Sequence, residues 1–318
     1  MIQSLQKKDK YHFAKTHQNS SLRYLCGFAP LRVFSISGCL PQNFEVSDFL
    51  LIMSIVKAEG IVIHTMNVRE SSKLVTLFTR EHGLLKLDAK AARTSKSRLR
   101  GNLELFSVVH LVYYEKENRE LQFMSQAERL EGFPELQTDL EKLGYASACC
   151  ELIRRTQAGV EAKPRLYPVL LETLRAMNTA QEPRLLFWGF QMKLLGMLGL
   201  APNLQYCLNC KTPSTASGEH GDAAVWHFHV TRGGFICPNC AGHTGALPLS
   251  GESLRVLSNF QTWPPAKLTR FKISPAATAE MAAFFRAYLS HHLEEAGALS
   301  SLKFVKEIKQ DLQTRQKS

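Results

Sequence analysis

Two pairs of cysteines carry the sharpest chemical signal in the sequence. Cys207 and Cys210 form one C-x-x-C pair, and Cys237 and Cys240 form a second. Each pair places two thiolates on one side of a tight turn, so two pairs can close a tetrahedral shell of four sulfurs. Zinc suits this shell because thiolates bind it without redox chemistry. We therefore predict a structural Zn²⁺ site, since four protein ligands leave no open position for catalysis.

The spacing between the two pairs is long for such a site. Residues 211–236 lie between them, whereas ~15–20 residues are common. A Ser- and Gly-rich insertion at 214–222 accounts for the excess. Two disulfides or four free thiols are the alternatives. The other four cysteines are Cys26, Cys39, Cys149 and Cys150. Because these thiols are unpaired and the sequence has no credible secretory signal, we expect the protein to reside in a reducing cytoplasm. Spare metal ligands lie nearby at His220, His227, His229 and His243.

A second chemical signal is a basic segment between residues 86 and 100. It holds six cations, three hydroxyl side chains and one anion, Asp88. Long cationic side chains can neutralise phosphates and release counterions, and hydroxyls can add hydrogen bonds to phosphate. A run of charge is also common on an ordinary solvated surface. The predicted nucleic-acid-binding residues are Lys90, Arg93, Lys96, Arg98 and Arg100, with Arg69 and Lys73 as weaker candidates.

The region that must position these cations, residues 53–130, has the pattern of a small β-barrel. Its strands are rich in β-branched and aromatic residues. Five short strands in about 75 residues is the size of an OB-fold, which commonly binds single-stranded nucleic acid; an SH3-like barrel would have a similar pattern. We expect most of the aromatic residues in the core, with Tyr113 and Tyr114 on opposite faces. The predicted strands are Ile55–Ile63, Lys73–Thr79, Leu84–Lys90, Leu105–Glu115 and Glu120–Ala127.

Residues 131–318 are predicted to form helices, interrupted by the zinc module at about 203–245. The apolar stretch 185–200 contains Gln191 and Lys193, so it is predicted to be a buried core helix, because a membrane span needs ~20 largely apolar residues. Ser274 and Pro275 are a predicted N-cap and first helical residue. The fold class is therefore multidomain: an N-terminal OB-fold β-barrel followed by an all-α domain with an inserted four-cysteine zinc module.

Composition and charge restrict the class of partner. Hydrophobic residues make up 45% of the 318 positions and charged residues 21%, which excludes wholesale disorder. The net charge of +11 and the isoelectric point of about 9.3 favour a polyanion, either nucleic acid or an anionic membrane surface. Residues 1–52 lack sustained periodicity. We predict that translation starts at or near Met53 and that residues 1–52 are a start-site artefact; a disordered tail is the alternative.

Motifs for catalysis do not assemble in this sequence, and we predict that the protein is not an enzyme. A zinc deaminase needs H-x-E ahead of P-C-x-x-C, but His292-Leu293-Glu294 follows the cysteines and the second pair reads C-P-N-C. The P-loop, G-x-G-x-x-G, H-E-x-x-H and G-x-S-x-G patterns are also absent from the sequence.

Four stretches in the barrel region occur in an order that matches a known family. They are VKAEGIVI (56–63), RESSKLVTLFTREHG (69–83), AKAARTSKSRL (89–99) and LELFSVVHLVYYE (103–115). With them the chain resembles the RecO family of bacterial recombination mediators and DNA-repair proteins, from residue 53 to about 313. The family typically has Lys-Gly-Ala-Arg where this chain has Lys90-Ala91-Ala92-Arg93. If that glycine serves a positive φ, we expect a different local turn here.

The resemblance implies a function in recombination. It implies binding of single- and double-stranded DNA, annealing of complementary strands, and partnership with RecR and single-stranded DNA-binding protein, so that RecA is loaded downstream. We expect a cytoplasmic, nucleoid-associated protein with no membrane partner. One alternative is an RNA- or ribosome-associated protein with an OB-fold and a zinc ribbon. Another is a protein-interaction scaffold whose charge only aids solubility.

Overall fold

The computed structural model describes most of the chain from Ser54 onward. The described residues belong to one compact unit, Leu51–Ser318. The described ranges are 54–68, 70–95, 97–99, 101–116, 119–158, 163–214, 225–240, 246–293 and 299–315. Residues 1–53 lie outside these ranges, so the start of translation near Met53 stays a prediction.

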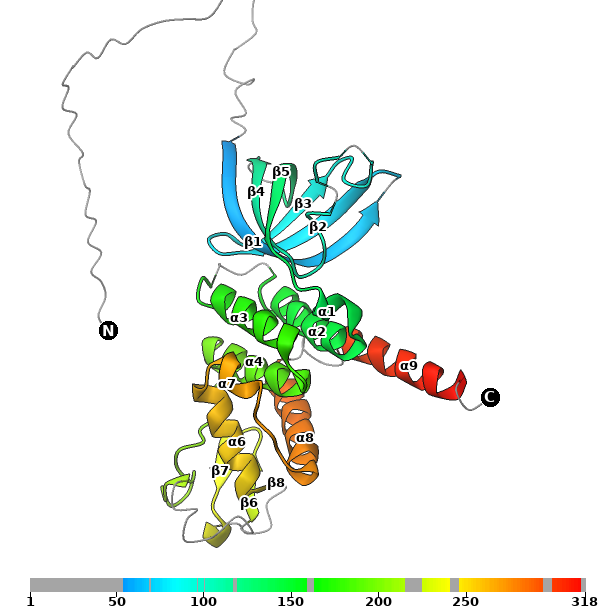
Figure 1. Ribbon diagram of the computed structural model, residues 1–318. Coiled ribbons are helices and arrows are strands. Elements are labelled where there is room, and N and C mark those ends of the chain that lie inside the picture. The colour runs from blue at the N-terminus through cyan, green and yellow to red at the C-terminus, as the bar shows by residue number, and fades with distance from the viewer. Residues whose placement is uncertain are drawn as a thin grey trace, which may run out of the picture. The chain divides into compact units, whose positions relative to one another are not determined.

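Five strands form an OB-like barrel in the order β1-β2-β3-β5-β4, and β4 pairs back with β1 (Figure 1). All neighbours are antiparallel except β3 and β5, which pair in parallel from Lys86–Leu121 to Asp88–Phe123. The predicted barrel is therefore confirmed. Its strands are β1 (Ser54–Val68), β2 (Ser72–Thr79), β3 (Gly83–Ala89), β4 (Val108–Glu115) and β5 (Leu121–Glu131).

Three strand boundaries differ from the sequence prediction by three residues or more. Strand β5 runs to Glu131, past the predicted end at Ala127, and the other two differences have identifiable reasons. Strand β1 continues to Val68, past the predicted end at Ile63, because its pairing with β2 shifts register between Val62 and His64. Such a bulge interrupts the period-two pattern without ending the strand. Strand β4 begins at Val108, later than predicted, because Phe106 has a φ of 70°, a left-handed conformation that extended strands do not contain.

Alternation along β4 explains which aromatic rings are available to a ligand. Val109, Leu111 and Tyr113 are buried in the barrel, whereas His110 and Tyr114 are exposed. Tyr113 and Tyr114 therefore do face opposite sides, as the pleat requires. The rings of Phe78 and Phe106 are also buried, so most barrel aromatics belong to the core.

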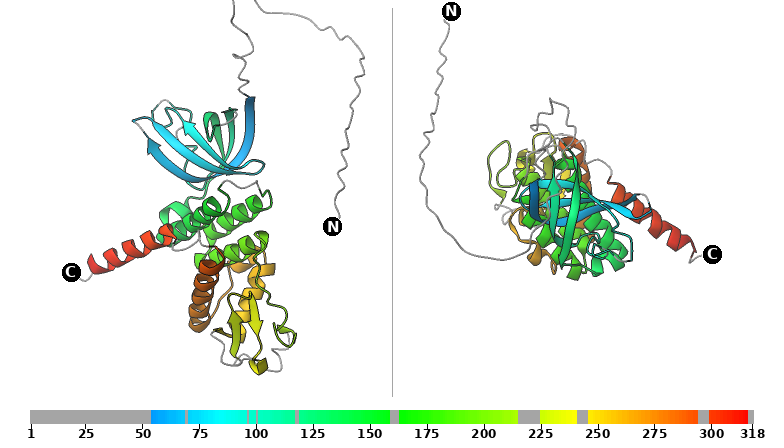
Figure 2. Two further views of the ribbon diagram at one scale, coloured as in Figure 1. Left: turned by 180° about the vertical axis from the view of Figure 1, so that it is seen from behind. Right: turned by 90° about the horizontal axis from the view of Figure 1, so that it is seen from above.

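The remaining chain forms helices and a small three-stranded sheet of order β7-β6-β8 (Figures 1 and 2). The helix α8 begins at the predicted cap, where the Ser274 hydroxyl accepts a hydrogen bond from the Ala277 N–H at 3.1 Å. The elements are α1 (Glu135–Thr138), α2 (Leu140–Thr156), α3 (Leu166–Thr179), α4 (Pro183–Met197), β6 (Val225–His229), β7 (Gly234–Ile236), the 3₁₀ helix η3 (Pro238–Cys240), β8 (Leu247–Ser250), α6 (Gly251–Thr262), α7 (Pro265–Leu268), α8 (Pro275–His292) and α9 (Ser300–Arg315).

One apolar cluster connects the barrel, the helices and the small sheet. Ile61 and Phe106 from the barrel belong to the same buried cluster as Leu170 of α3 and Trp226 of β6. A separate cluster fills the barrel interior. Among the described residues, none of the helices is long and apolar enough to cross a membrane.

Candidate metal centre and nucleic-acid interface

The four predicted metal ligands converge on one point. The Sγ atoms of Cys207, Cys210, Cys237 and Cys240 all lie within 4.8 Å of one another. A zinc ion with Zn–S bonds of ~2.3 Å would hold its sulfurs about 3.8 Å apart in a tetrahedron. The sulfurs therefore fit a tetrahedral ion, and among the described residues this is the one cluster of Cys, His or acidic groups that could hold a metal.

Backbone hydrogen bonds fold each cysteine pair into a tight turn. The Lys211 N–H donates to the Cys207 carbonyl at 3.1 Å, and the Cys240 N–H donates to the Cys237 carbonyl at 2.9 Å. Lys211 has a φ of 62°, which turns the first pair sharply. The Cys237 N–H also donates to the Cys207 sulfur at 3.3 Å. N–H groups aimed at sulfur favour the thiolate that a metal requires.

The exposed member of the cluster has the most acidic thiol. A hydrogen bond from the Thr212 hydroxyl, 3.1 Å away, lowers the pKa of Cys210 to about 6. By contrast, burial in α2 raises the pKa of Cys150 to about 12, and burial also raises the pKa of Cys149. A buried neutral thiol behaves as a small apolar side chain. Among the described cysteines, only the four clustered ones are therefore suited to bind a metal as thiolates.

The two nearby histidines that the structure describes do not join the cluster. The His229 Nδ1 lies 3.0 Å from the Thr231 hydroxyl, and neither His227 nor His229 belongs to the group of converging ligand atoms. His220, His243 and most of the 214–222 insertion lie outside the described residues. The four cysteines therefore make a complete ligand set without a histidine.

The predicted basic residues lie on the loop that leaves β3, here named the basic loop and defined as residues 90–100. Lys90, Arg93 and Arg98 are exposed. Two apolar side chains, Ala92 and Leu99, point into the barrel core and anchor the loop. Lys96 and Arg100 of this loop, and Arg69, lie outside the described residues, so their roles stay predictions.

The backbone of the basic loop contains one residue in the left-handed region. Ala91 has a φ of 57°, the conformation that a glycine adopts at little cost. The Arg93 N–H donates to the Ser71 carbonyl at 3.0 Å, which ties the loop to the β1–β2 turn. Ala91 itself thus takes a positive φ of the kind that a glycine would supply, so the alanine does not remove this conformation, contrary to our expectation.

Ion pairs separate the cations of this surface into two kinds. Lys86 pairs with Glu120, and the Lys73 Nζ lies 3.9 Å from a Glu104 carboxylate oxygen. Lys90 instead places its ammonium 4.6 Å from the centre of the Phe123 ring, a contact that keeps its charge available. Lys90 therefore keeps a charge that a ligand can reach, whereas Lys73 and Lys86 are paired with neighbouring carboxylates.

Sequence reasoning did not find two polar networks that join the parts of the chain. The Tyr167 hydroxyl of α3 donates to Glu59 of β1 at 3.0 Å, and Arg80 donates to the same carboxylate at 2.7 Å. Burial, followed by the hydrogen bond to Glu59, raises the pKa of Tyr167. No local sequence pattern could have predicted this network, because its three members are far apart in the sequence.

The second network holds the last helix. Glu151 of α2 is 4% exposed, and it accepts hydrogen bonds from the N–H and hydroxyl groups of Ser300 and Ser301 at 2.5–3.1 Å. The Arg155 guanidinium, one turn along the same helix, donates to it at 2.5 Å. Burial opposes its ionisation, but the serine donors hold its pKa down at about 2. The sequence could have indicated a buried, hydrogen-bonded carboxylate here, because an acidic residue stands between Cys150 and Leu152 on an apolar helix face.

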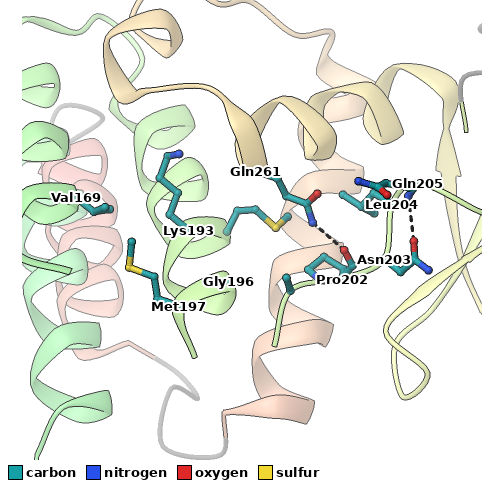
Figure 3. A pocket seen from close by; sticks show the side chains of 11 residues that line it. Val169, Lys193, Gly196, Met197, Pro202, Asn203, Leu204, Gln205 and Gln261 are labelled. Carbon is teal, nitrogen blue, oxygen red and sulfur yellow. Dashed lines mark hydrogen bonds between the residues drawn. The ribbon is translucent and has the colours of Figure 1, made fainter. Parts of the chain in front are cut away.

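A cavity of about 560 Å³ lies beside α4 (Figure 3). The Gln261 side chain at its wall donates to the Pro202 carbonyl at 2.8 Å, and the Asn203 side chain accepts from the Gln205 N–H at 3.1 Å. Burial lowers the pKa of Lys193 at the same cavity. Gln261 and Asn203 thus each use one amide atom to hold the chain itself, and Lys193 is the one charged side chain in the lining described.

Comparison with known families gives two matches in tandem. Residues 53–133 match the family model described as Recombination protein O N terminal, and residues 137–302 match Recombination protein O C terminal. The boundary between the two matches falls just after β5.

Curated relatives match over most of their length. The chain is 34% identical to the DNA repair protein RecO of Roseiflexus sp. (strain RS-1), over 82% of this chain and 88% of that protein. It is 31% identical to the DNA repair protein RecO of Desulforamulus reducens, over 76% and 91%. It is 29% identical to the DNA repair protein RecO of Bacillus subtilis (strain 168), over 71% and 85%.

Proposed function

This chain belongs to the RecO family of DNA repair and recombination proteins, and we propose that it mediates recombination by binding DNA through its basic loop. The observation that carries the proposal is the exposure of Lys90, Arg93 and Arg98 on one loop of an OB-like barrel. Exposed cations can exchange their counterions for phosphates, which supplies sequence-independent affinity.

Annealing of complementary strands follows from the same electrostatics. Two DNA strands repel each other through their phosphates, and a cationic surface that binds one backbone lowers this repulsion for a second strand. Contacts to phosphate leave the base edges free to pair. The protein would therefore accelerate pairing without making or breaking a covalent bond.

The proposed partners come from the family. We infer that the chain binds single- and double-stranded DNA, RecR and single-stranded DNA-binding protein, and thereby helps to load RecA onto coated strands. Simultaneous contact with DNA and a partner protein raises the effective concentration of each for the other.

The metal is proposed to be Zn²⁺ with a structural role. Cys207, Cys210, Cys237 and Cys240 would hold it, and their approach within 4.8 Å supports a closed tetrahedral shell. A closed shell stabilises the small β6–β8 sheet and leaves no position for a substrate.

The test is removal of charge from the basic loop. In the triple variant Arg93→Ala/Arg98→Ala/Arg100→Ala, we expect affinity for single-stranded DNA to fall about tenfold or more. The slope of log K against log salt should decrease by about 2, since each phosphate contact contributes ~0.7 for a single strand. Fluorescence anisotropy of a labelled oligonucleotide across a salt series measures both quantities.

A matched control removes a pair of charges that neutralise each other. The double variant Lys86→Ala/Glu120→Ala deletes the ion pair on β3 and leaves the net charge unchanged, so its affinity should stay within about twofold of the original protein. Unchanged affinity in the triple variant refutes the basic loop as the DNA site. Stronger competition by structured RNA than by single-stranded DNA would favour the RNA-binding alternative.

A further inference from the structure

A second cationic and aromatic surface lies in the helical part of the chain, on residues 263–272, here named the α7 surface. Lys267, Arg270 and Lys272 are exposed, and the ion pairs found among the described residues include none of the three. Between Glu252 and Glu280 the sequence contains no acidic residue. These cations therefore have no carboxylate of their own segment to neutralise them.

Two aromatic rings lie among these cations. Trp263 and Phe271 are only partly buried, and their rings meet edge to face with centres 5.3 Å apart. The Lys267 ammonium lies 5.9 Å from the centre of the Trp263 ring. By comparison, Trp188 is 5% exposed and Trp226 is fully buried. Trp263 is thus the tryptophan that a ligand in solvent can reach.

The α7 surface is held firmly by the helices beneath it. Leu268 of α7 is buried, and it packs so closely on Gly189 of α4 that a Cβ at residue 189 would lie 2.5 Å from its Cδ1. Helix α7 also contacts α3. A fixed backbone places the cations and rings before a ligand arrives, which reduces the entropy lost on binding.

We propose that the α7 surface binds a second single strand of nucleic acid. Lys267, Arg270 and Lys272 would neutralise successive phosphates, and a base would stack on Trp263 where the Lys267 ammonium now lies. This inference rests on the proposed function, because it supplies the second strand for annealing while the basic loop holds the first. Partly exposed rings distinguish the surface from a purely cationic face, which would bind an acidic protein equally well.

The experiment uses the intrinsic fluorescence of the full chain. Addition of an oligothymidylate should quench tryptophan emission saturably, because a base stacked on an indole quenches it and the other two tryptophans are buried. The quench should disappear in Trp263→Phe, which keeps an aromatic ring for packing. In the triple variant Lys267→Ala/Arg270→Ala/Lys272→Ala, the midpoint should shift to at least fivefold higher DNA concentration. Circular dichroism and the thermal midpoint verify that each variant is folded.

Two further arms separate this inference from the proposed function. The basic-loop triple variant should keep the Trp263 quench but lose energy transfer between two labelled, non-complementary oligonucleotides held on one protein. The α7-surface variant should weaken the quench and lose the energy transfer as well. If anisotropy shows DNA binding while Trp263 emission stays constant, the α7 surface is refuted and the basic loop stands. If neither measurement shows binding, both proposals fail. Equal competition by polyglutamate would also overturn the inference, since it would indicate an acidic protein partner.

Discussion

The cysteine cluster and the basic loop differ in how far residue type determines geometry. Four sulfurs converge within 4.8 Å, and each of them is useful only because the other three are present. On the basic loop, Lys90, Arg93 and Arg98 are spread along the surface, and each can contact phosphate independently. A convergent site therefore fails as a unit, whereas a dispersed site weakens by increments.

This contrast predicts the largest effect at the cysteines. The double variant Cys207→Ser/Cys210→Ser should lose bound zinc and its thermal midpoint should fall sharply, because binding of a structural zinc contributes ~10–16 kcal/mol in small domains. DNA affinity, measured at a temperature where the variant is still folded, should stay within about twofold. Elemental analysis, calorimetry and anisotropy measure the three quantities.

The control for the cysteine variant is His229→Ala, which removes a neighbouring side chain that lies outside the cluster. Its zinc content should equal that of the original protein. Full zinc occupancy in the serine variant would show that the four thiols are not the metal ligands. The cysteine cluster would then no longer serve as the example of a convergent site.

Glu151 extends the comparison to a convergent site without a metal. Its carboxylate gathers four donors from Ser300 and Ser301 and also pairs with Arg155 of the same helix. We expect Glu151→Gln to destabilise the protein by about 2–3 kcal/mol. Because its pKa is lowered to about 2, this stability is complete above the unfolded-state pKa of ~4.3 and is lost as the pH falls toward 2. Urea unfolding at pH 7 and pH 3 should show a smaller difference between the two proteins at pH 3.

Glu141→Gln serves as the matched control for Glu151. Glu141 lies on the same helix and pairs with Lys309 of α9, but both side chains of this pair are exposed. Exposed pairs contribute ~0–1 kcal/mol, so the control should unfold within about 1 kcal/mol of the original protein. Equal destabilisation by the two substitutions would contradict the claim that convergence of donors decides the effect.

Ala91 tests the backbone of the dispersed site. Its φ of 57° is costly for a residue with a Cβ, so Ala91→Gly should stabilise the protein by about 0.5–1 kcal/mol after the entropy of the unfolded glycine is counted. Urea midpoints measure this shift. The neighbouring Ala92→Gly should destabilise instead, because Ala92 is buried and has no positive φ to relieve. A loss of stability in Ala91→Gly would contradict the inference that the backbone at Ala91 is strained.

The smallest effect is expected at a cation that already has a partner. Lys73 lies 3.9 Å from Glu104, so Lys73→Gln should change DNA affinity less than twofold, whereas Lys90→Gln should weaken it more. Anisotropy titrations at low salt compare the two directly. A larger effect at Lys73 would mean that the ion pair opens when DNA binds.

Much of the fold was predictable because it depends on local patterns. Spacing alone predicted the four-cysteine cluster, and the cap at Ser274 predicted the start of α8. The predicted end of β1 was wrong because a bulge after Val62 changes the pairing register with β2. The register depends on the partner strand and not on the sequence of β1 alone. The pairing of Lys86 with Glu120 depends on a parallel contact between β3 and β5. Long-range pairing therefore decides which cations of the predicted site stay available.

One apolar cluster contains Ile61 of the barrel together with Cys207 and Trp226 near the small sheet. Through this shared core, a ligand bound at one end changes the thermal stability of the other. Residues that share one core unfold together, so a ligand bound only by the native form raises the melting temperature of everything in that core. On the proposed function, DNA bound at the barrel would therefore raise the temperature at which the cysteine cluster unfolds. A metal bound by the four cysteines would in turn raise the melting temperature of the barrel.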